Sequence, residues 1–130
     1  MTINPRRTVE FILWRSGMTG EDLAAAIGNE GDHTSTRSDA PITEAKWAVR
    51  EVGSEADDLS SLVEQVISRV RDLGPRLVQA CHASDATVML RIIQYASADD
   101  AVGAGFALEA RVISFLASVN AVLDVDQYVM

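Results

Sequence analysis

Residues 58–73 read DLSSLVEQVISRVRDL, and this stretch decides the fold class. Its apolar residues recur three and four positions apart with Ser, Glu, Gln and Arg between them, which predicts a helix buried along one side. Asp57 or Asp58 is suited to cap the first turn. Gly74 and Pro75 then end or kink the helix, because proline donates no backbone hydrogen bond. Pro75 can equally begin a new helical turn, which would extend to about residue 82.

Alternating apolar residues on both sides of this helix predict strands over residues 7–15, 45–52, 86–97 and 121–130. The stretch 86–97, ATVMLRIIQYAS, is apolar on both faces, which is typical of a central strand. Alternation divides the strand residues into two sets. The set expected to face the helices is Val9, Phe11, Leu13, Trp47, Val49, Val88, Leu90, Ile92, Leu123 and Val125.

Two shorter helices complete the pattern. Thr19 can cap the amide of Asp22, and Gly28 supplies a left-handed stop, so a two-turn helix is predicted between them. A third helix is predicted from Glu109 to about Val119. The polar residues 29–44 indicate a loop with a short edge strand around 33–37, and residues 98–104 indicate a second loop.

The resulting order predicts an α+β fold. We expect a ferredoxin-like βαββαβ core extended by a further β-α-β, with the helices packed on one face of a mainly antiparallel sheet.

Composition limits the classes of function. The chain has 130 residues, of which 48% are hydrophobic and 23% charged, which predicts one globular domain over 1–130 with a flexible tail at 1–6. Its 11 basic and 19 acidic residues give a net charge of −8. This balance argues against nucleic acid or an anionic membrane as a partner and fits a basic protein. No signal peptide or membrane-spanning run is visible, so we expect a cytoplasmic protein.

Residue types that usually carry catalysis or metal binding are sparse. Cys81 is the single cysteine, so no intrachain disulfide or CxxC pair forms. The two histidines, His33 and His82, lack the spacing of a zinc site. Ser84 or Ser97 with His82 and Asp85 lacks the G-x-S-x-G turn of a nucleophile. We therefore predict no catalytic residue, metal or cofactor.

Two carboxylates on the last strand form the remaining candidate for chemistry. Asp124 and Asp126 share one face of that strand, and Glu10 would join them if the first and last strands were close. Arg91 is the expected counter-ion if its strand is adjacent. A salt-bridge ladder on an exposed face is the commoner use of such residues.

The sheet face opposite the helices is the predicted interaction surface. Its tryptophan, tyrosines and methionine make it more apolar than an idle solvent face, so we interpret it as a surface for a partner or for self-association. A loop packed over it, or a shifted strand register, would also explain the pattern. The residues are Ile12, Trp14, Arg50, Met89, Arg91, Ile93, Tyr95, Asp124, Asp126 and Tyr128.

The order of elements resembles a bacterial family known as domain of unknown function 4279. The similarity covers residues 7–129 and rests on a first strand followed by GEDLAAAIG at 20–28, the strand at Trp47, the helix 59–73, and the closing segments GFALE at 105–109 and LDVDQY at 123–128. This chain lacks the proline that commonly follows Gly28 in the family. The resemblance implies a compact α+β domain in the bacterial cytoplasm. It implies no activity, so no catalytic residue carries over.

We expect a non-catalytic protein-interaction module, in its concrete form an immunity-type protein that neutralises a basic partner. One alternative is a small-molecule-binding domain or small enzyme with a pocket lined by Trp14, Arg91, Asp124, Asp126 and Tyr128. A second alternative is a homodimer joined through the open sheet face.

Overall fold

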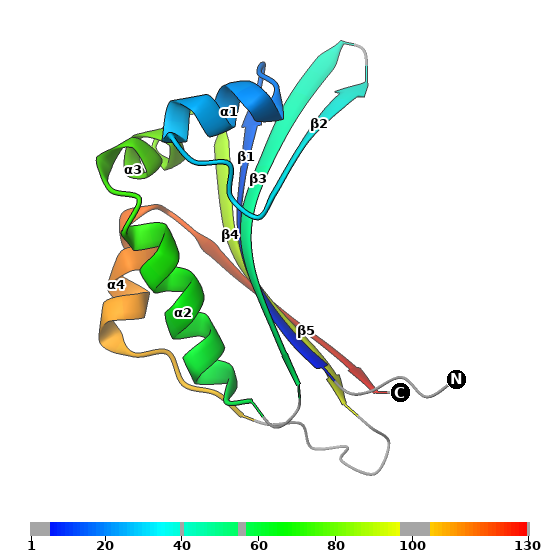
Figure 1. Cartoon of the computed structure of the whole chain (residues 1–130), viewed down its shortest axis with the longest axis vertical. Coiled ribbons are helices and arrows are strands. Elements are labelled where there is room, and N and C mark those ends of the chain that lie inside the picture. The colour runs from blue at the N-terminus through cyan, green and yellow to red at the C-terminus, as the bar shows by residue number, and fades with distance from the viewer. Residues whose placement is uncertain (1–5, 40, 55–56, 97–104, 130) are drawn as a thin grey trace.

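The fold is a five-stranded sheet with helices on one of its faces, as seen in a computed structural model that describes residues 6–39, 41–54, 57–96 and 105–129 (Figure 1). Four helices are present in these residues. The elements in chain order are β1 (Arg6–Ser16), α1 (Gly20–Ile27), β2 (His33–Asp39), β3 (Ile42–Ser54), α2 (Leu59–Arg71), α3 (Pro75–Cys81), β4 (Ala86–Ala96), α4 (Ala110–Ser118) and β5 (Val122–Val129).

The strand order is β2-β3-β1-β4-β5, so β1 lies at the centre. It pairs antiparallel with β3 and β4, and β2 pairs antiparallel with β3. β5 pairs parallel with β4, since α4 carries the chain back between them. The predicted mixed α+β class and mainly antiparallel sheet are confirmed. The additional strand expected before α4 is not present in the described residues, because 105–109 carry no strand and 97–104 lie outside the description.

Local sequence signals set the helix ends. The Thr19 side chain accepts a hydrogen bond from the Asp22 amide at 3.1 Å, and Gly28 ends α1 with φ of 82°. Asp58 caps α2 by accepting from the Ser60 amide at 3.2 Å. The chain breaks at Gly74, where φ is 79°, and Pro75 begins the separate helix α3. The alternative in which Pro75 starts a new helix is therefore the correct one.

Strand lengths depart from the sequence-based bounds. β2 covers all of His33–Asp39, and β3 starts at Ile42, so the predicted loop 29–44 is mostly the hairpin of these two strands. The sequence underestimated the length of β2, because its residues are polar and turn-forming and an edge strand needs no buried face. The predicted tail 1–6 meets the description only at Arg6, which begins β1.

The core lies between the sheet and the helix layer. Eight of the ten side chains predicted to face the helices are buried there: Val9, Phe11, Leu13, Trp47, Val49, Val88, Leu90 and Ile92. From the helices come the apolar stripe of α2 and the Phe115 ring of α4, whose centroid lies 6.2 Å from that of Phe11. α3 is fastened to α1 by Arg76, whose Nε donates to the Ala26 carbonyl at 2.9 Å, which satisfies a free carbonyl near the end of α1.

Candidate interaction surface

The residues predicted for the open sheet face lie together on that face. Strand register puts Trp14, Ile12 and Glu10 of β1 on one side, opposite Lys46, Ala48 and Arg50 of β3 and opposite Thr87, Met89 and Arg91 of β4. On β4 and β5 the same side carries Ile93, Tyr95, Asp124, Asp126 and Tyr128. The helices lie on the other side (Figure 1). The structure thus brings the whole predicted set to one face of the sheet.

A row of alternating charges crosses the middle of this face. Arg50, Glu10, Arg91 and Asp124 occupy directly opposed positions on β3, β1, β4 and β5. Arg50 donates to Glu10 Oε2 from Nη2 at 2.6 Å and from Nε at 3.0 Å. Arg91 Nε lies 3.3 Å from Asp124 Oδ2. The expected pairing of Arg91 is therefore confirmed, and the cations and anions of the row neutralise one another.

The centre of the face is buried even though no described helix covers it. Ile12 is 0% exposed and Glu10 is 4% exposed. The Arg50 side chain contacts Glu10 through two hydrogen bonds. Ile12 is consequently part of the interior and offers no surface to a partner.

Carboxylates from the first and last strands do not converge. β4 separates β1 from β5, which places Glu10 about 10 Å from the β5 carboxylates. Asp124 and Asp126 do interact: partial desolvation and the neighbouring Asp124 carboxylate raise the pKa of Asp126, and Arg91 lowers it by less. Asp126 lies opposite Ile93, and within the described ranges it has no ion-pair partner.

Aromatic residues occupy opposite ends of the face. The rings of Tyr95 and Tyr128 stack with centroids 5.1 Å apart, and the Arg6 guanidinium lies 5.4 Å from the Tyr95 centroid. Trp14 is opposite Thr87, eight residues along β4 from Tyr95, which is about 27 Å. The pocket predicted from Trp14, Arg91, Asp124, Asp126 and Tyr128 is therefore not assembled as one site.

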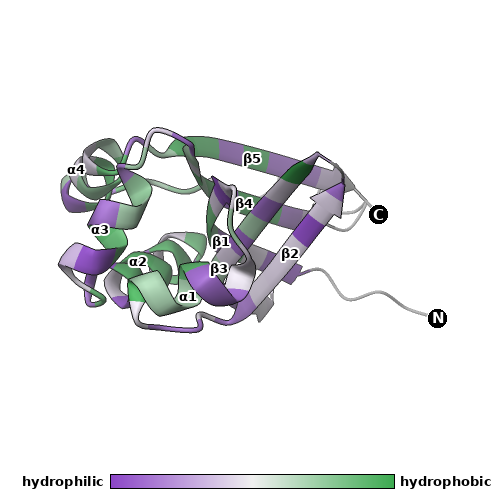
Figure 2. Cartoon of the chain, turned by 90° about the horizontal axis from the view of Figure 1, so that it is seen from above, coloured by the Kyte–Doolittle hydropathy of each residue, from purple (hydrophilic) through white to green (hydrophobic). Residues whose placement is uncertain are grey.

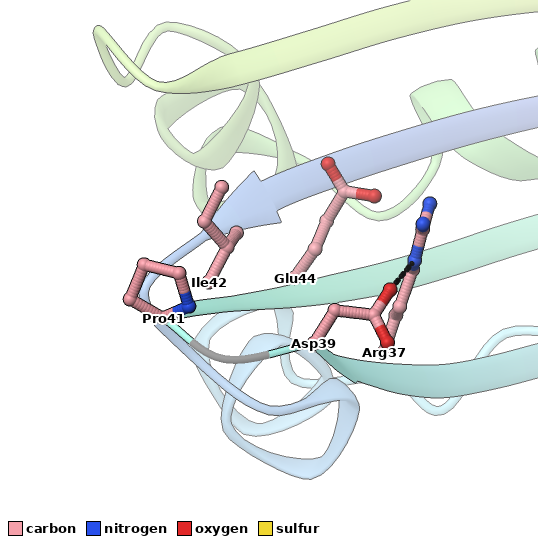
Figure 3. A pocket seen from close by; sticks show the side chains of 5 residues that line it. All are labelled: Arg37, Asp39, Pro41, Ile42 and Glu44. Atoms are coloured by element: carbon pink, nitrogen blue, oxygen red, sulfur yellow. Dashed lines mark hydrogen bonds and ion pairs between the residues drawn. The ribbon is translucent and has the colours of Figure 1, made fainter.

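A hollow of about 310 Å³ lies at the end of the β2–β3 hairpin (Figure 3). Arg37, Asp39, Pro41, Ile42 and Glu44 line it, and Arg37 Nε lies 2.5 Å from Asp39 Oδ2. Both residues of this ion pair are well exposed, so the hollow is an open, solvated corner of the hairpin. None of the residues predicted for the interaction surface lines it.

The histidines and the cysteine take ordinary positions. His33 begins β2 and is exposed, and His82 caps the end of α3. Burial raises the pKa of the Cys81 thiol to about 12, which keeps it protonated and unreactive. Within the described residues, no three His, Cys, Asp or Glu side chains are grouped to hold a metal ion. No described helix is long and apolar enough to cross a membrane.

Leu123 and Val125 correct the sequence-based division of core and surface. They lie on the helix side of β5, opposite Leu90 and Ile92, as predicted. However, they are 44% and 39% exposed and do not belong to the core. Their exposure shows that the described helices do not cover this part of β5.

Ile113 of α4 is a further exposed apolar residue on the helix layer. Arg111 Nη2 lies 2.8 Å from Glu64 Oε2, so that flank of α4 faces α2, which packs over β1 and β3. Ile113 is two residues further, about 200° around the helix, and so lies on the flank of α4 away from Arg111. It is 53% exposed. We call Leu123 and Val125 the apolar strip; periodicity assigned both of them to the core and so missed it.

The two edge strands differ in chemistry. β2 has the sequence HTSTRSD and is polar and exposed throughout. β5 has the sequence VLDVDQYV, and its Val122, Leu123, Val125 and Tyr128 are all prominently exposed. Viewed from above, β5 carries hydrophobic and hydrophilic segments in alternation and lies at the opposite edge from β2 (Figure 2). Polar edges resist pairing with other chains, whereas apolar edges invite it.

An ion cluster on the helix side ties the loop before β2 to α2. Arg69 donates to Asp32 Oδ1 at 2.7 Å and to Asp32 Oδ2 at 2.9 Å, and it also reaches Glu51 Oε1 at 3.0 Å. Asp32 Oδ2 accepts from the Arg50 amide at 2.8 Å. The Arg69 hydrogen bonds, opposed in part by desolvation, hold the pKa of Asp32 below its ordinary value.

Replacing Asp32 by asparagine is expected to lower the free energy of unfolding by about 1 kcal/mol at pH 7. This is the usual contribution of a partly exposed ion pair with two hydrogen bonds, such as Asp32 with Arg69. Since the folded-state pKa is the lower one, this contribution is present above about pH 4 and is lost as the pH falls further. Urea unfolding of Asp32→Asn and the parent chain at pH 7 and pH 3 tests this. A difference that grows toward pH 3 would contradict it.

The architecture and the surface together define a class: an α+β domain with one helix-covered sheet face, one open face and one apolar edge. A comparison with family models then gives the family. The model described as Domain of unknown function (DUF4279) matches residues 24–130, and the chain belongs to this family. The match starts inside α1, so β1, which the resemblance included, lies outside it. Comparisons of the chain with curated proteins and with solved structures found no match.

Proposed function

We propose that this domain is a non-catalytic protein-interaction module that binds an extended segment of its partner along the outer edge of β5. The observation that carries the proposal is the exposure of Val122, Leu123, Val125 and Tyr128 on an edge strand without proline or lysine. Nothing in the described residues pairs with that edge, since β5 is the last strand of the sheet. Such an edge accepts a further strand through its free backbone groups.

The apolar strip supports the same proposal. Leu123 and Val125 lie on the helix side of the edge strand and are exposed, so an added strand would bury its alternate side chains against them. In its concrete form the partner is a basic protein that the domain neutralises, because the net charge of −8 favours encounter with a cation. A bacterial, cytoplasmic setting belongs to this proposal as well.

We also propose that β1–β4, α1 and α2 form a ferredoxin-like unit. The antiparallel pairs β1–β3, β2–β3 and β1–β4 support it, since they are the pairings expected of a βαββαβ chain with its helices on one face. In this description α4 and β5 are an addition, and the proposed binding edge belongs to the added strand.

A selection from a random displayed peptide library tests the interaction proposal. Enriched peptides are expected to slow amide hydrogen exchange in 122–129 and to lose at least tenfold in affinity for the double variant Leu123→Lys/Val125→Lys. Lysine there places charge in the apolar strip without disturbing the core, since both side chains are exposed.

The matched control is Thr34→Lys/Ser38→Lys, which adds the same charges to the helix-side face of the polar edge strand β2. It is expected to bind the peptides as the parent does. Peptides that bind both double variants equally well, or that protect only β2, would overturn the proposal.

A further inference from the structure

We infer that the segment received by β5 is a basic strand, with Lys or Arg at alternate positions on the open-face side and apolar residues on the helix side. The inference rests on the proposed function and deepens it. It comes from the side-chain pattern of β5 and from the charges next to it.

The two sides of β5 present different chemistry to an added strand. Leu123 and Val125 point to the helix side, whereas Asp124 and Asp126 point to the open face two residues apart. Neighbouring strands place same-face side chains about 5 Å apart, so residues i and i+2 of a partner would lie opposite the two carboxylates. Apolar residues between them would meet the apolar strip. Alternation of basic and apolar residues satisfies both sides at once.

The ion pairs within the described residues leave the β5 carboxylates available to a basic partner. Arg91 Nε lies 3.3 Å from Asp124 Oδ2, and both side chains are partly exposed. Glu10, which is opposite Arg91 on β1, forms its ion pair with Arg50. Asp126 lies opposite Ile93 and has no ion-pair partner in the described part of the chain. Of the two edge carboxylates, Asp126 therefore has no ion-pair partner among the described residues, and Asp124 has only the partly exposed Arg91.

The same carboxylates disfavour a second copy of the chain as the occupant. In a two-fold antiparallel pair, opposed residues lie on the same face. A pair centred on Val125 sets Asp124 of each copy opposite Asp126 of the other. A pair centred on Asp124 or Asp126 sets that carboxylate opposite itself. Like charges directly opposed destabilise a strand pair, so each of these three registers is penalised.

Three synthetic peptides that alternate valine with lysine, threonine or glutamate test the inference. Binding is measured by fluorescence anisotropy. The lysine peptide is expected to bind at least fivefold more tightly than the threonine peptide, and the glutamate peptide most weakly. In Asp124→Asn/Asp126→Asn the preference for lysine over threonine should fall below twofold.

The matched control is Glu21→Gln/Glu30→Gln, which removes the same two charges from exposed positions on α1 and the following loop. It should keep the preference, because a general effect of net charge would fall equally in both variants. Circular dichroism verifies that each variant is folded.

The outcomes separate the two proposals. If threonine and lysine peptides bind equally, or if both double variants reduce the preference alike, the basic partner is overturned while edge binding stands. If no peptide binds the parent chain, edge binding is overturned too. A sedimenting dimer that Leu123→Lys/Val125→Lys dissociates would identify a second copy as the occupant and overturn the inference.

Discussion

Replacing Trp47 by alanine is expected to lower the free energy of unfolding by about 3–5 kcal/mol, the usual cost of deleting a buried aromatic side chain. Trp47 is 0% exposed, and its indole Nε1 donates to the Asn29 carbonyl at 2.9 Å. The loop that follows α1 closes over the ring at Gly31, where φ is 65° and an added Cβ would lie 2.9 Å from Nε1. Loss of the ring therefore leaves a cavity and an unsatisfied carbonyl.

Urea unfolding followed by circular dichroism measures this effect. Trp47→Phe keeps most of the packing and loses the hydrogen bond, so a smaller loss of about 1–2 kcal/mol is expected. Val52→Ala on the same strand is the surface control, because Val52 is 58% exposed, and it should change stability by less than about 0.5 kcal/mol. A loss for Trp47→Ala no larger than that of Val52→Ala would contradict the packing described for this ring.

Replacing Arg50 by methionine is expected to cost about 2–3 kcal/mol, because it leaves the Glu10 carboxylate in the sheet without its two hydrogen bonds from Arg50. Breaking a fully buried pair costs about 3–5 kcal/mol, and the half-exposed Arg50 lowers this value by admitting water. The double variant Glu10→Leu/Arg50→Met should recover most of the loss, since apolar isosteres of a buried pair are often neutral.

A double-mutant cycle with urea unfolding tests the Glu10–Arg50 pair. Arg37→Met is the matched control, because its pair with Asp39 is 76% and 67% exposed and should contribute less than about 0.5 kcal/mol. A double variant as unstable as Arg50→Met would show that the row of charges matters through contacts other than this pair.

Sequence patterns predicted much of this fold because they reflect local chemistry. The spacing of Leu62, Val66 and Val70 defines the buried side of α2, and Thr19 and Gly28 define the ends of α1. Strict alternation placed Trp14, Met89 and Tyr95 on the open face. β2 was predicted too short, since the loss of periodicity in HTSTRSD is the same in a loop and in a polar edge strand.

The surface was predicted less completely. Alternation determines the side to which Leu123 and Val125 point, but it carries no information about where the helix layer ends. Alternation also could not predict whether Glu10 lies beside Asp124, because the order of strands in the sheet depends on long-range pairing. The family match covers residues 24–130 and so leaves out β1, the strand around which the pairing is organised.

The sequence by itself determined most element types, the side to which each strand residue points and the charge of −8, because these follow from local spacing and composition. Tertiary structure alone decided that β1 is central, that β5 is an edge, and that the apolar strip is uncovered. The physical reason is that exposure depends on which elements stack over a residue. That arrangement is set by pairing between distant strands, which no local window of the chain records.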